Sequence, residues 1–390
     1  MGFAQPKLIK KKDSLSFRIS LVLTPSTHPI GFEPTTPDSL HSKLCLDRRI
    51  TTLIFLEFQC SIQAELRVHE FRTKSSYLKL AKLFKPTLAT ETMKIPITFL
   101  GTGQAVPTSK RNHTSILINY KSEAILIDCG EGTQRQFRKA KLNPCKLTKI
   151  LITHWHGDHI LGIPGLLQTL ALNNYNRKLQ IYIPQGTKHY LDAIFRIFAF
   201  VGKINLEVKE CSPGTIFENQ DYKIECEEMS HGTPCLAYSI IEKEKIRIDK
   251  VKLKKYKLKG KIIGELQKGK DIEFNGKKIK AKSLIYIQPG KKITFILDTV
   301  LNDNMAKIAK DSDLLVCESS YTKEEENLAK EYKHLTAEQV ASVAKKAKVK
   351  KLVLTHLSQR YESREKIVLN EAKKTFKNVI IAEDLMKLEV

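Results

Sequence analysis

The sequence has few features of a secreted, disulfide-bonded or membrane-spanning protein. None of its eight cysteines stands in a C-x-x-C pair, and a chain of 390 residues does not need disulfides to build a core, so we expect reduced thiols and a cytoplasmic location. No apolar run reaches the roughly 18 residues that a membrane-spanning helix needs, so we expect no membrane partner. The N-terminus also lacks the order of charged, apolar and small residues that marks a secretory signal.

Acidic residues are in the minority. The chain carries 42 Asp and Glu against 66 Lys and Arg, which gives a formal net charge of +24. A hydrophobic content of 42% is typical of a globular protein. The excess of positive charge favours a polyanionic partner such as a nucleic acid. A lysine-rich solvated surface is the alternative, and charge alone does not decide between the two.

Regular patterning is weak before Met93. Proline-rich turns interrupt residues 24–37, and the apolar piece at 53–56 is isolated. We therefore expect residues 1–92 to be an N-terminal extension without a packed core, either poorly ordered or the product of a wrongly assigned start. A small separate domain is the alternative. Residues 93–390 are then the functional domain.

From Met93 onward, apolar patterning predicts strands and then helices, twice over. In the first half we expect strands at 94–100, 115–119, 124–128 and 147–153 and helices at 132–140, 161–172 and 188–200. In the second half we expect strands at 236–241, 292–297, 314–317 and 351–355 and helices at 304–309, 337–347 and 367–376. This order favours an α/β fold in which two sheets pack together with helices outside.

A dense group of metal-binding side chains follows the apolar run 150–152. His154, His156, Asp158 and His159 lie within six residues, directly after this predicted strand. Imidazoles with one carboxylate are a donor set that Zn²⁺ prefers. A polar loop that carries three histidines in this spacing by chance would be rare, so the pattern predicts a metal site.

Three further donors stand at the ends of apolar segments, namely His231, Asp298 and His356. Each alone is more often a capping or turn residue, but strand ends are where layered α/β folds place their chemistry. With the first group they make seven ligands, and a single structural Zn²⁺ needs only four. Two cations are therefore expected, and paired cations suit hydrolysis at phosphorus.

These motifs resemble those of known hydrolases. The H-x-H-x-D-H motif, followed in order by His231, Asp298 and His356, resembles the metallo-β-lactamase superfamily. The segments 99–103, 128–136, 231–234 and 354–361 resemble the ribonuclease Z family, the endonucleases that process tRNA 3′ ends. The resemblance covers residues 93–390. It implies a metallo-β-lactamase αββα sandwich with an inserted basic arm at about 242–268.

The resemblance also implies a function and roles for the site. It implies a zinc-dependent endoribonuclease that removes 3′ trailers from precursor tRNA and leaves a 3′-hydroxyl. Two Zn²⁺, with Mn²⁺ possible, would be held by His154, His156 and His231 and by Asp158, His159 and His356, with Asp298 bridging. Asp158 would accept the proton of the attacking water, and His334, oriented by Glu318, would protonate the leaving oxygen. A helix-capping role is the alternative for His334.

A basic run lies between residues 243 and 261, with ten Lys and Arg against two acidic residues. A solvated surface loop is the alternative reading. In the resembled family an arm at this position contacts tRNA, and the arm of one subunit serves the other subunit of a homodimer. The expected RNA contacts are Lys250, Lys252, Lys254, Lys255, Lys257, Lys259 and Lys261, together with Arg111 and Asn112 near the cleavage site. Phosphate contacts would supply the affinity.

Two other classes of function remain open at this stage. A hydrolase of the same fold that acts on small phosphodiesters or thioesters would share the ligands without needing the basic arm. A non-catalytic RNA-binding module would tolerate lost ligands, whereas all seven are present here.

Overall fold

The computed structural model describes residues 94–198, 204–256, 258, 260–274 and 276–390. The expected extension over residues 1–92 lies outside the described residues. Two of the expected RNA contacts, Lys257 and Lys259, lie outside them as well.

The first of two large sheets is built mostly from the first half of the chain. Its strands lie in the order β18-β1-β2-β3-β4-β5-β6. They are β1 (Pro96–Gly101), β2 (Ser115–Tyr120), β3 (Glu123–Ile127), β4 (Leu147–Leu151), β5 (Lys178–Pro184), β6 (Asn205–Cys211) and β18 (Lys387–Glu389). The pairs from β3 to β6 are parallel, so the carboxyl ends of these strands meet at one edge.

The second sheet is built from the second half in the order β17-β16-β15-β14-β9-β8-β7. Its strands are β7 (Gly214–Glu218), β8 (Tyr222–Ser230), β9 (Pro234–Glu242), β14 (Lys292–Ile296), β15 (Leu314–Glu318), β16 (Leu352–Thr355) and β17 (Val379–Ile381). The pairs from β14 to β17 are again parallel. Asp298 and His356 follow β14 and β16, so both lie at the edge where these strands end.

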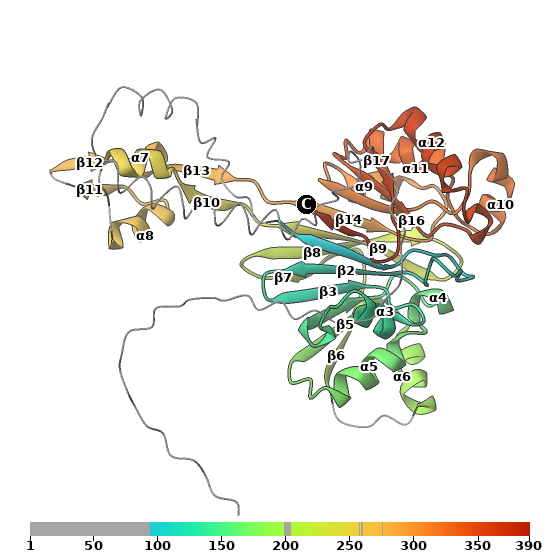
Figure 1. Cartoon of the computed structure of the whole chain (residues 1–390). Coiled ribbons are helices and arrows are strands. Elements are labelled where there is room, and N and C mark those ends of the chain that lie inside the picture. The colour runs from blue at the N-terminus through green and yellow to red at the C-terminus, as the bar shows by residue number, and fades with distance from the viewer. Residues whose placement is uncertain (1–93, 199–203, 257, 259, 275) are drawn as a thin grey trace, which may run out of the picture. The chain divides into compact units, whose positions relative to one another are not determined.

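The two sheets pack face to face, and helices cover the outer face of each (Figure 1). Successive side chains of β3 point to opposite faces of its sheet, and both faces are apolar. Ile125 and Ile127 point into the core between the sheets, whereas Ala124 and Leu126 pack under the helices. The first sheet carries α3 (Thr133–Lys139), α4 (Gly157–Ile160), α5 (Ile163–Leu172) and α6 (Lys188–Ile197). The second carries α9 (Asp303–Ala309), α10 (Glu326–Glu331), α11 (Ala337–Lys346) and α12 (Glu365–Thr375).

An insertion between β9 and β14 forms the arm. A ribbon of β10 (Lys245–Ile248) and β13 (Ile285–Gln288) leads to α7 (Lys250–Lys255), α8 (Lys261–Gln267), β11 (Ile272–Phe274) and β12 (Lys277–Ile279) (Figure 1). These elements have an apolar core of their own, which includes Leu258, Leu266 and Leu284. The insertion therefore extends beyond its expected end near residue 268, because the β11–β12 hairpin and β13 belong to it.

The predicted elements of the main body are present, with shifts at their ends. Six strands of the two large sheets were not predicted from the sequence: β5, β6, β7, β8, β17 and β18. The helix expected at 188–200 ends at Ile197 in the structure, and residues 199 and 200 lie outside the described range. Within the described residues, no helix is long and apolar enough to span a membrane.

Candidate metal centre

The segment after β4 is fixed to both sheets. Asp128, which directly follows β3, accepts hydrogen bonds from the backbone N–H and the hydroxyl of Thr153, each at 2.7 Å. From the second sheet, the Leu236 N–H donates to the Thr153 carbonyl at 2.9 Å, and the Tyr238 hydroxyl donates to the Ile152 carbonyl at 2.6 Å. The histidine motif is therefore positioned by the sandwich itself.

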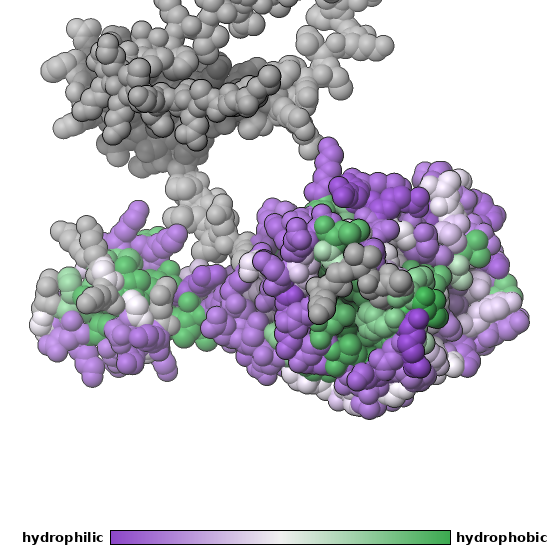
Figure 2. All heavy atoms as spheres, turned by 90° about the horizontal axis from the view of Figure 1, so that it is seen from below, coloured by the Kyte–Doolittle hydropathy of each residue, from purple (hydrophilic) through white to green (hydrophobic). Residues whose placement is uncertain are grey.

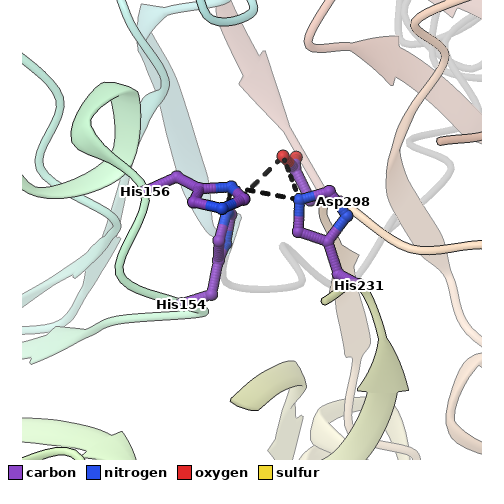
Figure 3. Close-up of side chains that lie close together, drawn as sticks. All are labelled: His154, His156, His231 and Asp298. Carbon is purple, nitrogen blue, oxygen red and sulfur yellow. Dashed lines mark hydrogen bonds and ion pairs between the residues drawn. The ribbon is translucent and has the colours of Figure 1, made fainter. Parts of the chain in front are cut away.

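The first group consists of His154, His156, His231 and Asp298, whose ligand atoms all lie within 4.8 Å of one another. The Nδ1 atom of His156 lies 3.1 Å from Nε2 of His154 and 3.1 Å from Nε2 of His231. Figure 3 shows these rings and the Asp298 carboxylate turned toward one centre. Three imidazole nitrogens and one carboxylate oxygen can hold one Zn²⁺-like cation.

The second group consists of Asp158, His159, His356 and, again, Asp298. The Nε2 atoms of His159 and His356 lie 3.1 Å apart, and each lies 3.3 Å from Oδ2 of Asp158. Asp298 presents Oδ2 to the first group and Oδ1 to the second, where Oδ1 lies 3.1 Å from Nε2 of His356. This Oδ1 is buried and accepts no hydrogen bond from the described residues, which fits a carboxylate that shares a cation.

Outer contacts hold four of these rings in place. In each of them Nδ1 contacts a protein oxygen, so Nε2 is the nitrogen directed at the centre. The pairs are His154 with the Thr153 hydroxyl (3.1 Å), His159 with Asp128 (2.6 Å), His231 with the Lys333 carbonyl (2.9 Å) and His356 with the Ser320 hydroxyl (3.2 Å). Such contacts fix both ring orientation and tautomer.

The charges at the centre favour cation binding. Burial alone would raise the pKa of Asp158, but the neighbouring His159 and His356 hold this pKa well below its ordinary value. The pKa of Asp298 is likewise lowered, because His356, His159 and His154 outweigh its burial. Burial lowers the pKa of His154. Ionised carboxylates and a neutral imidazole are the forms that bind metals.

Glu318 and His334 lie beside the second group. Nδ1 of His334 is 3.1 Å from both carboxylate oxygens of Glu318, which is fully buried. The Thr299 N–H (2.8 Å) and the Ser320 hydroxyl (2.7 Å) also donate to Glu318. Burial opposes protonation of His334, but the Glu318 carboxylate raises its pKa to about 9. The capping side chain of α11 is Thr336 and not His334.

A cleft of about 490 Å³ opens over both groups. Asp158, His231, Asp298 and His334 line it together with other residues, including Gln104, Val106, Tyr321, Tyr332 and Arg360. The arrangement offers a carboxylate that can accept a proton, an imidazolium that can donate one, and two places for cations. These are the parts that hydrolysis of a phosphodiester needs.

Arg111 and Asn112 do not line this cleft. The Arg111 guanidinium is buried and donates to the Thr102 hydroxyl and the Ala382 carbonyl, each at 2.7 Å. The Asn112 side chain donates to the Glu131 carbonyl at 2.6 Å. In this arrangement both side chains support their loop, and the expected RNA contacts stay predictions.

The arm presents exposed lysines beyond those in the basic run between residues 243 and 261. Lys250, Lys252, Lys254 and Lys255 are exposed on α7, whose first turn is capped by Asp249. The backbone of Lys261 begins α8. The hairpin adds an exposed set that the sequence reasoning passed over: Lys277, Lys278, Lys280 and Lys282. The K-K-x-K-x-K spacing was the available signal, but it lies beyond the expected end of the arm.

Two residues that position the site were also missed. Asp128 was noted only as part of a motif, although it binds both Thr153 and His159. The carbonyl of Lys333 orients His231, and no sequence pattern marks a backbone oxygen for such a role.

Comparison with known proteins gives relatives along most of the chain. A family model described as anti-Pycsar protein Apyc1 matches residues 95–197, which is less than half of the chain. Ribonuclease Z of Methanosarcina mazei is 40% identical over 301 residues, covering 75% of this chain and 97% of that protein. Ribonuclease Z of Bacillus cereus is 37% identical over 302 residues, with 75% and 98% covered.

Solved structures agree on the fold. The short form of human tRNase Z matches with a TM-score of 0.56 and 27% identity, covering 75% of this chain and 98% of that chain. The metallo-β-lactamase fold protein YhfI of Bacillus subtilis matches with a TM-score of 0.57 and 17% identity, covering 77% and 100%. The predicted metallo-β-lactamase sandwich is therefore confirmed.

Proposed function

The chain belongs to the ribonuclease Z family, and from this premise we propose that it is an endoribonuclease that removes 3′ trailers from precursor tRNA and leaves a tRNA 3′-hydroxyl. The observation that carries the proposal is the convergence of seven metal-binding side chains beside a Glu318–His334 pair. Four of the seven, together with His334, line one open cleft.

The donor set supports two cations of the Zn²⁺ type, with Mn²⁺ as the alternative. His154, His156 and His231 would hold one, and Asp158, His159 and His356 the other, with one oxygen of Asp298 for each. Oδ1 of Asp298 has no hydrogen-bond partner among the described residues, and outer contacts at Nδ1, such as that of His231, direct Nε2 toward the centre. Both features favour this assignment over a purely structural cluster. When bound, such a pair lowers the pKa of water and neutralises charge on the phosphate.

The protein side chains would move the protons. Asp158, ionised and lining the cleft, would accept the proton of the attacking water. As the bond from phosphorus to the 3′ oxygen breaks, His334 would donate a proton to that oxygen, so that tRNA leaves with a 3′-hydroxyl. Glu318 would hold His334 in place through Nδ1, which leaves Nε2 to donate. The trailer would keep the phosphate at its 5′ end.

The arm would bind the body of the tRNA. The four exposed lysines of α7 stand on one short helix of the arm, and the arm has an apolar core of its own. The lysines would therefore form a stable charged surface rather than part of a loose loop. Contacts of this kind bind phosphates by counterion release and recognise shape rather than sequence.

We also propose that the protein is a homodimer. Figure 2 shows apolar surface gathered on the face seen from below, where Figure 1 has α5 and α6. At the ends of these two helices, Leu172 (64%), Ile197 (73%) and Phe198 (48%) are exposed apolar side chains. Apolar surface of this kind is typical of a protein interface. A cytoplasmic location is proposed because the described cysteines are free thiols.

Other functions have less support. A non-catalytic RNA-binding module has no need for seven converging ligands. A phosphodiesterase restricted to small substrates is not favoured, because the ribonuclease Z relatives match over almost their whole length.

The proposal is tested by incubating the purified chain with a 3′-extended tRNA transcript and mapping the new end. We expect one cut directly after the last nucleotide of the mature acceptor stem, lost on chelation and restored by Zn²⁺ or Mn²⁺. The Asp158→Ala variant should bind the transcript without cutting it. Cleavage at scattered sites, or cleavage that survives in this variant, would contradict the proposal.

A further inference from the structure

Tyr332 is an exposed aromatic residue in the cleft over the candidate metal centre. Its side chain is 55% exposed and lines the same cleft as Asp158, His231 and His334. The proton transfers and cation binding described above do not use it. An aromatic ring left open beside a phosphodiester-cleaving site is suited to stacking on a nucleobase.

The backbone holds Tyr332 at the cleft. It caps α10, where its N–H donates to the Leu328 carbonyl at 2.9 Å. The next residue, Lys333, adopts a left-handed conformation with φ of 58°, and its carbonyl meets Nδ1 of His231 at 2.9 Å. The N–H of His334 then donates to the Ala329 carbonyl at 2.7 Å. Tyr332 is thus fixed through the same turn that orients a proposed metal ligand.

The ring face of Tyr332 is also open, in contrast to that of Tyr321, which lines the same cleft. Tyr321 is only 5% exposed, and the guanidinium of Arg360 lies 5.2 Å from its ring centre. Within the described part of the chain, no ring, cation or hydrogen-bond partner contacts the side chain of Tyr332. A base could therefore stack there without displacing a protein group.

The position relative to His334 indicates which base would stack. On the proposed function, on which this inference rests, His334 protonates the leaving 3′ oxygen. That oxygen belongs to the last nucleotide of the mature tRNA, whereas the attacking water approaches from the opposite side of the phosphorus. Tyr332 lies two residues from His334 along the chain, and both line the cleft, so the leaving-group side is the side assigned to Tyr332 here.

We propose that Tyr332 stacks on the base of the last mature nucleotide and thereby seats its 3′ oxygen against His334. Stacking is tolerant of base identity because every base has a π-face, so one residue can serve precursors that differ in the base on the tRNA side of the cleaved bond. Tyr332 is on this account a substrate-binding residue, and it takes no part in proton transfer.

The test compares the full chain with Tyr332→Leu and Tyr332→Phe on three precursor tRNAs. One is unmodified, one lacks the base of the last mature nucleotide, and one lacks the base of the first trailer nucleotide. On the unmodified substrate we expect Tyr332→Leu to lose roughly 5- to 150-fold in kcat/KM and Tyr332→Phe to stay close to the intact protein. Thermal stability and metal content of both variants should equal those of the intact chain.

The decisive comparison is on the abasic substrates. When the last mature base is missing, the intact protein should lose a similar factor, and Tyr332→Leu should add no further loss. When the first trailer base is missing, Tyr332→Leu should still show its full loss. Equal losses for Tyr332→Leu on the unmodified and the mature-abasic substrate would overturn the proposal, and so would unchanged cleavage by Tyr332→Leu. Either outcome leaves precursor cleavage intact, whereas no cleavage by the intact chain would refute the proposed function itself.

Discussion

Replacing the four lysines of α7 by glutamine should weaken tRNA binding and flatten its salt dependence. Lys250, Lys252, Lys254 and Lys255 are all exposed, and within the described part of the chain only Lys252 forms an ion pair, with Asp249 at 3.7 Å. Glutamine removes the charge but has a helix propensity close to that of lysine, so α7 and its Asp249 cap should remain.

The magnitude follows from counterion release. Each neutralised phosphate contributes about 0.9 to the slope of log affinity against log salt on duplex nucleic acid. If each lysine meets one phosphate, the slope should become shallower by about 3 to 4 units. The loss of affinity should therefore be large at low salt and should shrink as salt increases.

Fluorescence anisotropy with a labelled precursor tRNA measures this slope, and the Asp158→Ala background prevents cleavage during the titration. A matched control replaces four exposed lysines near the end of α11, Lys345, Lys346, Lys348 and Lys350, which changes the net charge equally. If the α7 variant and the control show the same slope, α7 is a solvated surface and the arm has been assigned the wrong role.

Four further predictions concern the centre, the leaving group, the extension and the dimer. Elemental analysis should find close to two Zn²⁺ or Mn²⁺ per chain, falling to one or fewer in Asp298→Ala; a value near one in the reconstituted intact chain would contradict the paired site. His334→Ala should slow precursor cleavage by about 10²- to 10⁴-fold but spare a nitrophenyl phosphodiester, whose leaving group needs no proton; equal losses on both would refute the donor role. A chain that starts at Met93 should melt and cleave like the full chain, and loss of either property would show that residues 1–92 support the fold. Ile197→Glu should convert the dimer to a monomer in light scattering, and an unchanged mass would place the interface elsewhere.

The sequence predicted those parts of the fold that depend on local apolar patterning. β3 and β15 are continuous apolar runs because both of their faces are buried, so their existence could be read directly. β8 was missed because polar residues alternate along it, and β7 was missed because it is a strand of only five residues at the edge of the sheet. The length of the arm was underestimated because β11 and β12 have only three residues each.

The site divides in the same way. Four of the seven proposed ligands could be named because their side-chain types and spacing are unusual in a polar loop, and the other three because they stand at the ends of apolar segments. Their division between two cations came only from the resemblance, since it depends on how β4, β8, β14 and β16 meet at one edge. The contribution of Lys333 is a backbone oxygen, and the exposure of Tyr332 depends on the turn at the end of α10. Neither the position of a backbone oxygen nor the exposure of a side chain can be predicted from the type of the residue.

The central claim is that water, positioned by this centre, attacks the phosphorus and expels the tRNA 3′ oxygen. Cleavage of a precursor tRNA in water labelled with oxygen-18, followed by mass analysis of both products, tests it most directly. The account predicts an unlabelled 3′-hydroxyl on the tRNA and one labelled oxygen in the 5′-phosphate of the trailer. A tRNA that ends in a 2′,3′-cyclic phosphate, or a trailer with an unlabelled 5′-hydroxyl, would contradict it.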